Sequence, residues 1–119
     1  MAENITVDPK DAQDNKVMGI LAYLGILVLV PIFAAKESPF ARFHANQGLV
    51  LLIASFAYSI VVWIVTFVLA MVSPKLALIG TLLSFVSLVF LVLMIIGIIN
   101  AAKGEMKELP IIGKYRIIK

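Results

Sequence analysis

The chain has no cysteine, one histidine and no acidic residue inside its long apolar runs. Without cysteine it cannot form a disulfide, a thiolate metal site, an iron–sulfur cluster or a thiol nucleophile. A single histidine cannot by itself build a bis-histidine haem site or a multi-histidine metal centre. Proton-coupled carriers usually hold an ionisable residue within the membrane, and none is present in the apolar runs. We therefore expect no metal, no cofactor and no proton-driven transport.

The chain is unusually rich in hydrophobic residues. Hydrophobic residues make up 62% of the sequence and its mean hydropathy is +1.08, whereas a soluble domain is usually about half apolar. The apolar residues form long runs that do not alternate with polar residues as barrel strands do. The sequence predicts an all-α membrane protein with three transmembrane helices, over about residues 17–35, 46–72 and 76–102. A polar, flexible tail (1–16) precedes them and a basic interfacial segment (103–119) follows.

The second and third predicted helices form a long antiparallel hairpin, because only Ser73-Pro74-Lys75 separates them. Each is about 40 Å long at about 1.5 Å per residue, which exceeds a hydrocarbon core of about 30 Å, so the helices must tilt or protrude. The hairpin returns Asn100 to the start of the second helix. We therefore predict a polar pair between Asn46 and Asn100 across the helix ends.

Small and hydroxyl-bearing residues recur at helical spacing in all three predicted helices. Small residues let membrane helices approach closely, and hydroxyl groups there form inter-helix hydrogen bonds worth about 0.6 kcal/mol each. Two alternatives stay open: glycine and alanine are common in membrane helices, and the hydroxyl groups could line a wet path. The predicted packing residues are Gly19, Ala22, Gly25, Ser55, Ser59, Gly80, Ser84 and Ser87.

A polar loop over residues 36–47 separates the first two apolar runs. It is predicted to lie at one membrane surface beside the basic C-terminal segment. Its phenylalanines can sit in the interface while its cations reach lipid phosphates. His44 could shuttle a proton or bind phosphate; alternatively it could cap a helix, bond a carbonyl or contact Asn100. The predicted patch for protein or anionic lipid comprises Lys36, Phe40, Arg42, Phe43, His44, Gln47, Lys107, Lys114, Arg116 and Lys119.

Three membrane crossings would place the two termini on opposite sides. Seven basic residues then lie on the side of the loop and the C-terminal segment, against three on the other side. The excess of positive charge predicts a cytoplasmic loop and C-terminus, with the N-terminus outside. Nucleic acid is a weaker explanation of the net charge of +3, because the cations are divided among several segments.

Three motifs point to a family: Leu21-Ala22-Tyr23-Leu24-Gly25, the Phe40-x-Arg42-Phe43-His44-Ala45-x-Gln47 helix start, and Ala101-Ala102-x-x-Gly104 followed by Leu109-Pro110-Ile111-Ile112-Gly113. Over about residues 17–113 the chain resembles small bacterial and archaeal membrane proteins related to the Tic-twenty subunit of the chloroplast inner-envelope protein translocon. The resemblance implies a multi-pass protein of a prokaryotic cytoplasmic membrane. The chloroplast relatives belong to a protein-import complex with proposed channel activity, but they resemble four-helix proteins, whereas three helices are predicted here.

These observations favour an integral membrane interaction or scaffold subunit over an enzyme, because no nucleophile can be paired with an acid or base. Its expected partners are anionic lipid and a further copy of itself or another membrane protein, not nucleic acid. The alternative is a small pore-forming protein, either a translocon-like channel or a holin-like lytic protein. Induced expression would distinguish them, since a holin collapses the membrane potential and kills the cell.

Overall fold

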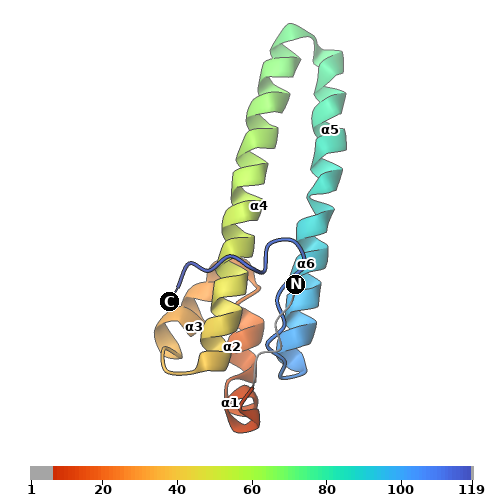
Figure 1. Ribbon diagram of the computed structural model, residues 1–119. Helices are drawn as coiled ribbons and strands as arrows, with labels where there is room; N and C mark the ends of the chain where they lie inside the picture. The colour runs from red at the N-terminus through yellow and green to blue at the C-terminus, as the bar shows by residue number, and fades with distance from the viewer. Residues whose placement is uncertain (1–6, 119) are drawn as a thin grey trace.

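The computed structural model describes residues 7–118, and this part of the chain is helical with no strand. An antiparallel hairpin dominates it (Figure 1). Helix α4 (Pro39–Val72) rises to a tight turn, and the chain returns through a short 3₁₀ helix, η2 (Pro74–Leu76), into α5 (Ala77–Val86) and α6 (Leu88–Ala102). Both arms are long and apolar enough to cross a membrane. The all-α class and two long apolar helices agree with the sequence prediction.

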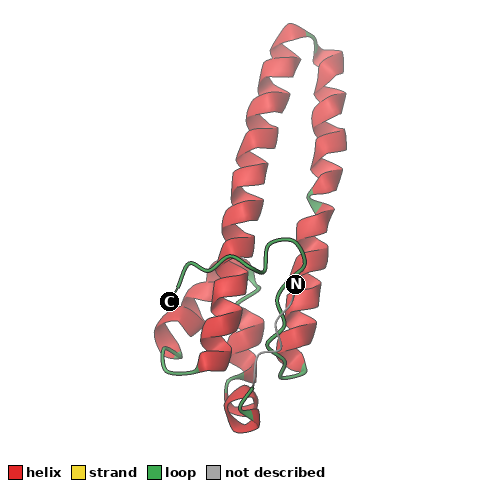
Figure 2. Ribbon diagram, in the orientation of Figure 1, coloured by secondary structure: helices red, strands yellow, loops and turns green. Residues whose placement is uncertain are grey.

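Four short helices surround the open end of the hairpin and form a broad base with it (Figures 1 and 2). They are α1 (Pro9–Asp14), α2 (Lys16–Leu21), the 3₁₀ helix η1 (Gly25–Val28) and α3 (Leu29–Ala34). Helix α2 packs against both α4 and α6, whereas η1 and α3 pack against α4. The molecule is therefore elongated, with extents of 57 × 27 × 21 Å.

The prediction of one continuous transmembrane helix over residues 17–35 is wrong. The chain leaves the helix after Leu21, and Gly25 has a φ of +64°, in the left-handed region that glycine adopts at little cost. The following segments, η1 and α3, have four and six residues. At about 1.5 Å per residue, neither α2 nor α3 extends beyond about 9 Å. The segment is apolar enough for a membrane helix, but it is folded into short pieces against the hairpin.

The described N-terminal region is attached to the base and is not a free tail, and residues 1–6 lie outside the described part. One carboxylate oxygen of Asp11 accepts a hydrogen bond from Ser38 Oγ (2.5 Å), and the other accepts from the Phe40 N–H (3.0 Å). This fixes α1 to the start of α4. The N-terminal region, the 36–47 loop and residues 103–118 therefore lie at one end of the hairpin. The prediction that the two termini lie on opposite sides of a membrane is not confirmed, because the described residues form two long apolar arms and not three.

Helix α4 begins seven residues earlier than the predicted 46–72 boundary, and local chemistry explains the start. Ser38 caps the helix, with its Oγ accepting from the Ala41 N–H at 3.0 Å, and Pro39 occupies the first turn. The helix has 34 residues, about 51 Å. Its buried residues all lie between Phe40 and Leu51. The remaining stretch to Val72 is about 31 Å long, close to the thickness of a hydrocarbon core.

Glycines allow the helices to approach one another. A Cβ on Gly48 would lie 1.7 Å from the carbonyl oxygen of Ala22, one on Gly80 would lie 2.0 Å from Thr66 Oγ1, and one on Gly97 would meet the Tyr23 ring at 2.3 Å. A Cβ on Gly19 would also meet a neighbour, Phe40, at 2.8 Å. The predicted packing role of Gly25 is not seen, because a Cβ there would meet nothing within 4 Å.

We predict that Gly48→Ala will destabilise the base by about 1–3 kcal/mol, because the new methyl group forces α2 away from α4. The measurement is the thermal unfolding of the purified protein in detergent. The control is Ala57→Leu on the exposed part of the same helix, where we expect little change. Equal transition temperatures for Gly48→Ala and the unchanged protein would contradict this packing.

Candidate functional site

The side chain of His44 lies at the centre of the base. The imidazole has no exposed surface, and three aromatic rings contact its edges or faces: Phe40 at 4.6 Å between centroids, Phe43 at 5.2 Å and Tyr23 at 5.5 Å. Each of these rings is strongly inclined to the imidazole, which is the favoured edge-to-face arrangement of aromatic pairs. The histidine is thus an interior residue and not part of a surface patch.

Hydrogen bonds occupy both ring nitrogens of His44. Nε2 lies 2.7 Å from the carbonyl oxygen of Glu105, and Nδ1 lies 2.7 Å from the hydroxyl of Tyr23. A carbonyl oxygen can only accept, so Nε2 donates; in the neutral imidazole Nδ1 then accepts from the tyrosine. The ring therefore links the turn after α2, the helix α4 and the start of the C-terminal segment. Of the roles left open for His44, bonding to a carbonyl is the one seen.

Gln47, one turn along α4, binds the C-terminal segment in the same way. Its Oε1 accepts from the Leu109 N–H at 2.9 Å, and its Nε2 donates to the Gly113 carbonyl at 2.8 Å. The side chain is 1% exposed. The amide thus supplies a donor and an acceptor to backbone that has no regular secondary structure of its own. Without such partners, each buried backbone group would carry the cost of desolvation.

Asn46 completes the contact with the C-terminal segment. Its Oδ1 accepts from the N–H groups of Ile117 (3.0 Å) and Ile118 (2.6 Å), and its Nδ2 donates to the Arg42 carbonyl at 3.3 Å. These bonds occupy the amide, so the predicted pair with Asn100 does not form. Asn100 is itself buried near the end of α6. We call Asn46, Gln47 and His44 the polar clamp, because together they hold residues 105–118.

The predicted surface patch divides into buried and exposed residues. Phe40, Phe43, His44 and Gln47 are buried, and Arg42 is half-buried. The exposed members within the described residues are Lys36, Lys107, Lys114 and Arg116, while Lys119 lies outside them. The motif that suggested a binding loop therefore serves the protein's own interior.

Arg116 and Lys107 both have partners within the chain. The guanidinium of Arg116 pairs with Glu108 at 2.7 Å, lies 5.3 Å from the centroid of the Phe43 ring, and donates to the Gly113 carbonyl. Lys107 pairs with Glu105 at 3.2 Å. Both pairs are at the surface, where such bridges contribute about 0–1 kcal/mol. They orient the C-terminal segment more than they stabilise it.

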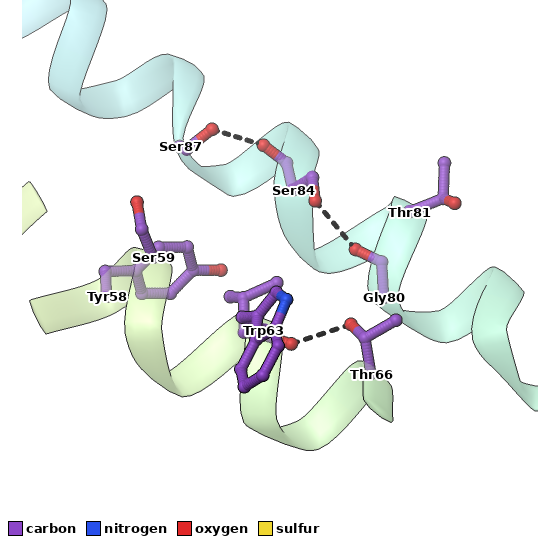
Figure 3. Close-up of a pocket in the computed structure, with 9 residues that line it drawn as sticks. Tyr58, Ser59, Trp63, Thr66, Gly80, Thr81, Ser84 and Ser87 are labelled. Atoms are coloured by element: carbon purple, nitrogen blue, oxygen red, sulfur yellow. Dashed lines mark hydrogen bonds between the residues drawn. The ribbon is translucent and has the colours of Figure 1, made fainter. Parts of the chain in front are cut away.

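A hydroxyl-lined groove of about 360 Å³ separates α4 from α5 in the part of the hairpin outside the base (Figure 3). Most of the hydroxyl groups bond to carbonyls of their own helix: Ser59 to Ser55, Thr66 to Val62 and Ser84 to Gly80, at 2.7–2.9 Å. Tyr58 instead crosses to the Leu83 carbonyl at 2.7 Å. The lining residues are Tyr58, Ser59, Val62, Trp63, Thr66, Gly80, Thr81, Ser84 and Ser87.

The predicted packing residues are distributed between two regions. Gly19 and Ala22 are buried in the base, Gly80 is buried against Thr66, and Ser59, Ser84 and Ser87 line the groove. Ser55 is half-buried, and its Oγ donates to the Leu52 carbonyl of its own helix. None of these four predicted serines bonds across to the facing arm in the described structure. The predicted inter-helix bonding by Ser55, Ser59, Ser84 and Ser87 is therefore not seen within residues 7–118.

Three residues central to the base were not singled out as site residues from sequence: Tyr23, Asp11 and Gly97. The sequence signal for Tyr23 was a lone tyrosine inside an apolar run, and the signal for Asp11 was an acid three residues after another acid. Neither pattern is specific. No group of three or more histidine, aspartate or glutamate side chains within the described residues could hold a metal ion. The polar groups gathered here bind backbone and each other.

We predict that Gln47→Leu will loosen the C-terminal segment. The change leaves the Leu109 N–H without its acceptor, at a cost of about 1–3 kcal/mol, so the fraction of molecules with a detached C-terminal segment should rise by about fivefold to about a hundredfold. Limited trypsin digestion in detergent should then cut faster at Lys107 and Lys114. Gln13→Leu on the exposed surface of α1 makes the same chemical change and should leave the rate unaltered. Unchanged cleavage in Gln47→Leu would show that the amide does not hold the segment.

Comparison with known proteins identifies relatives along almost the whole chain. The sequence profile described as the magnetosome magnetite crystal formation protein family matches residues 14–118. The chain is 34% identical to the magnetosome protein MamF of Paramagnetospirillum magneticum, over 97% of this chain and 96% of that protein. It is 34% identical to MamF of Magnetospirillum gryphiswaldense (95% of each chain), and 32% identical to a UPF0132 membrane protein of Methanocaldococcus jannaschii (84% and 83%).

No solved structure matches the chain significantly. The matches agree with the broader part of the sequence-based resemblance, since they include bacterial and archaeal proteins and one that is named as a membrane protein. None of them links the chain to Tic-twenty, so that identification is corrected. Both the matched profile and the MamF relatives cover the polar clamp and both arms of the hairpin, and the chain belongs to the MamF/MmsF family of magnetosome proteins.

Proposed function

We propose that this chain is an integral membrane interaction subunit whose hairpin crosses the bilayer and associates there with further copies of itself. The observation that carries the proposal is the exposure of the hairpin. Only 17% and 11% of the most apolar stretches of its two arms are buried within the chain. Such surfaces require either lipid or protein as a neighbour. The base, in contrast, is internally satisfied and offers no assembled set of reactive groups, which favours an interaction role over catalysis.

The groove between α4 and α5 favours protein as one of these neighbours. It is partly polar, and Trp63, which lines it, is 68% exposed. Membrane helices associate through small residues and close packing, since hydrocarbon supplies no hydrophobic driving force between them. A side chain from a second copy could fill the groove over Gly80 and Ser84, where a disordered acyl chain packs less well. We therefore place the contact between copies on the groove side of α5.

The charge distribution supports one orientation. Among the described residues, every lysine and arginine except Lys75 lies in the base or the segments attached to it, and Lys75 lies in the turn between the arms. Short segments rich in positive charge remain cytoplasmic. We propose that the base and both ends of the described chain face the cytoplasm. The earlier proposal of an external N-terminus depended on three crossings.

The family suggests a setting for this assembly. The description of the matched family refers to magnetite crystal formation, and the MamF relatives are named as magnetosome proteins. We propose that this chain, like those relatives, works as a subunit within a membrane and that it is not a catalyst. The archaeal relative is named only as a membrane protein, so the common element is the membrane fold.

A pore-forming role has one observation in its favour, the hydroxyl lining of the groove. Four of these hydroxyl groups donate to carbonyls of their own arm, so their donors are not directed at a water path. Conductance of the reconstituted protein in planar bilayers tests this alternative. Steady conductance that Ser84→Leu abolishes would favour the pore over the interaction subunit.

We predict that copies carrying Ser84→Cys will cross-link in the membrane through a short thiol-reactive linker. The control is Val86→Cys, which is also exposed but lies about 200° around the helix. The natural chain has no cysteine, so both variants carry a single thiol. The dimer yield should be higher for Ser84→Cys and should persist on dilution with lipid. Equal yields that fall with dilution would contradict a specific contact.

We also predict the sidedness of single cysteines in whole cells. Gln13→Cys and Lys107→Cys should both be protected from a membrane-impermeant thiol reagent added outside, whereas Lys75→Cys should react. Labelling of only one of Gln13→Cys and Lys107→Cys would mean an odd number of crossings and would contradict the two-arm topology.

A further inference from the structure

The two ends of the molecule differ in width. At the base, α2 packs against α4 and α6, and α3 packs against α4, whereas beyond the base only α4, α5 and the start of α6 remain (Figure 1). A membrane crossed by this hairpin therefore meets more protein on the side of the base than on the side of the turn. The lipid experiences this difference in width only if the additional helices expose apolar side chains and lie at the depth of the bilayer.

The surface of η1 and α3 is suited to lipid. No charged residue lies between Lys16 and Lys36. Ile26 is 69% exposed and Phe33 is 68% exposed. Lys36 has its Nζ 5.9 Å from the centroid of the Phe33 ring, so a cation marks the outer limit of this surface. The exposed apolar side chains, which we call the apolar shelf, are Leu24, Ile26, Leu27, Leu29, Val30 and Phe33.

The apolar shelf also lies at a suitable depth. Val28, at the end of η1, is fully buried, and the carbonyl oxygen of Ala22, three residues before η1, lies against Gly48 of α4, about one turn before Leu51. The exposed part of α4 begins just beyond Leu51 and extends about 31 Å to Val72, which matches a hydrocarbon core of about 30 Å. Segment η1 therefore lies level with the boundary between acyl chains and headgroups. Apolar faces of interfacial helices enter this zone by about 5–10 Å.

We propose that the apolar shelf inserts into the leaflet on the side of the base and makes the protein a wedge, so that the protein favours membranes that are convex on that side. The proposal rests on the proposed function, because it needs the hairpin to cross the bilayer. The shelf enlarges the protein's cross-section at the headgroup level of one leaflet alone. Convex curvature spreads the headgroups of that leaflet and accommodates the extra area.

The acyl chains of this leaflet, and not a second copy, are the occupant to which the proposal commits. The shelf is continuous with the exposed hairpin surface that the bilayer would cover, since η1 packs directly against α4. Lys36 follows the shelf by three residues and is exposed, and Lys16, at the start of α2, is the nearest exposed lysine before it in sequence. Such cations favour the phosphates of a lipid headgroup layer.

The first measurement is depth. Single cysteines at Ile26, Val61 and Gln13 are labelled with a small fluorophore in the full chain, reconstituted with lipids brominated at shallow or deep acyl positions. Val61 is exposed and lies midway between Leu51 and Val72. We expect shallow bromines to quench Ile26→Cys most, deep bromines to quench Val61→Cys most, and neither to quench Gln13→Cys strongly. Unquenched Ile26→Cys with quenched Val61→Cys would overturn the shelf alone. Unquenched Val61→Cys would overturn the membrane-crossing hairpin and with it the proposed function.

The second measurement is curvature sorting. The labelled chain is reconstituted in giant vesicles of phosphatidylcholine and phosphatidylglycerol with the base outward, as trypsin cleavage of the C-terminal segment verifies. A narrow tether is then pulled from each vesicle. We expect a higher protein-to-lipid ratio in the tether than in the parent membrane. The ratio should fall towards one for Ile26→Ser with Leu27→Ser, and stay high for Ile26→Val with Leu27→Ile, which keeps the shelf apolar.

Equal ratios in tether and parent membrane for the unchanged chain would overturn the curvature preference. So would an enrichment that the serine variant retains in full. If cysteines at Ile26 cross-link between copies and are shielded from bromine, a second copy covers the shelf, and the lipid wedge is wrong.

Discussion

The base depends on one constraint: the C-terminal segment has no regular secondary structure, yet part of its backbone is buried. Backbone N–H and C=O groups removed from water need partners. Successive turns of α4 supply them through side chains, with His44 bonding the Glu105 carbonyl and Gln47 bonding both Leu109 and Gly113. The C-terminal segment in turn crosses α4 and contacts it at Asn46 (Figure 2). The start of the long helix and the end of the chain thus stabilise each other.

The same constraint explains why the base can be polar inside and apolar outside. Tyr23 bonds His44 in the interior while its neighbour Leu24 is exposed. Asp11, a half-buried acid, is satisfied by Ser38 and the Phe40 N–H. No buried side-chain nitrogen or oxygen atom in the described residues lacks a hydrogen-bond partner. An interior of this kind specifies one arrangement of helices, because few alternatives would satisfy every group.

The hairpin could be predicted from sequence and the base could not, for a physical reason. Two apolar runs joined by Ser73-Pro74-Lys75 have one simple solution, since each run is longer than the bilayer is thick. The run over 17–35 has the same composition but bends at Gly25, and its break follows from contacts with residues far along the chain, such as Gly48 and Gly97. Hydropathy records how apolar a segment is and not whether it is straight. The motif around His44 was recognised as special, but its partners, 61 to 72 residues away, could not be read from local pattern.

The turn at Ser73-Pro74-Lys75 has a consequence for how the protein is made. In the proposed orientation this turn is the part of the chain that must travel to the far side of the bilayer, and it carries a single cation, Lys75. Both arms can therefore enter the membrane together as a preformed pair of helices, with little polar material to translocate. The base is completed only after the second arm has been synthesised, because its C-terminal partner follows that arm in the chain. The last step of folding is therefore the closure of the C-terminal segment over a hairpin whose two arms already exist.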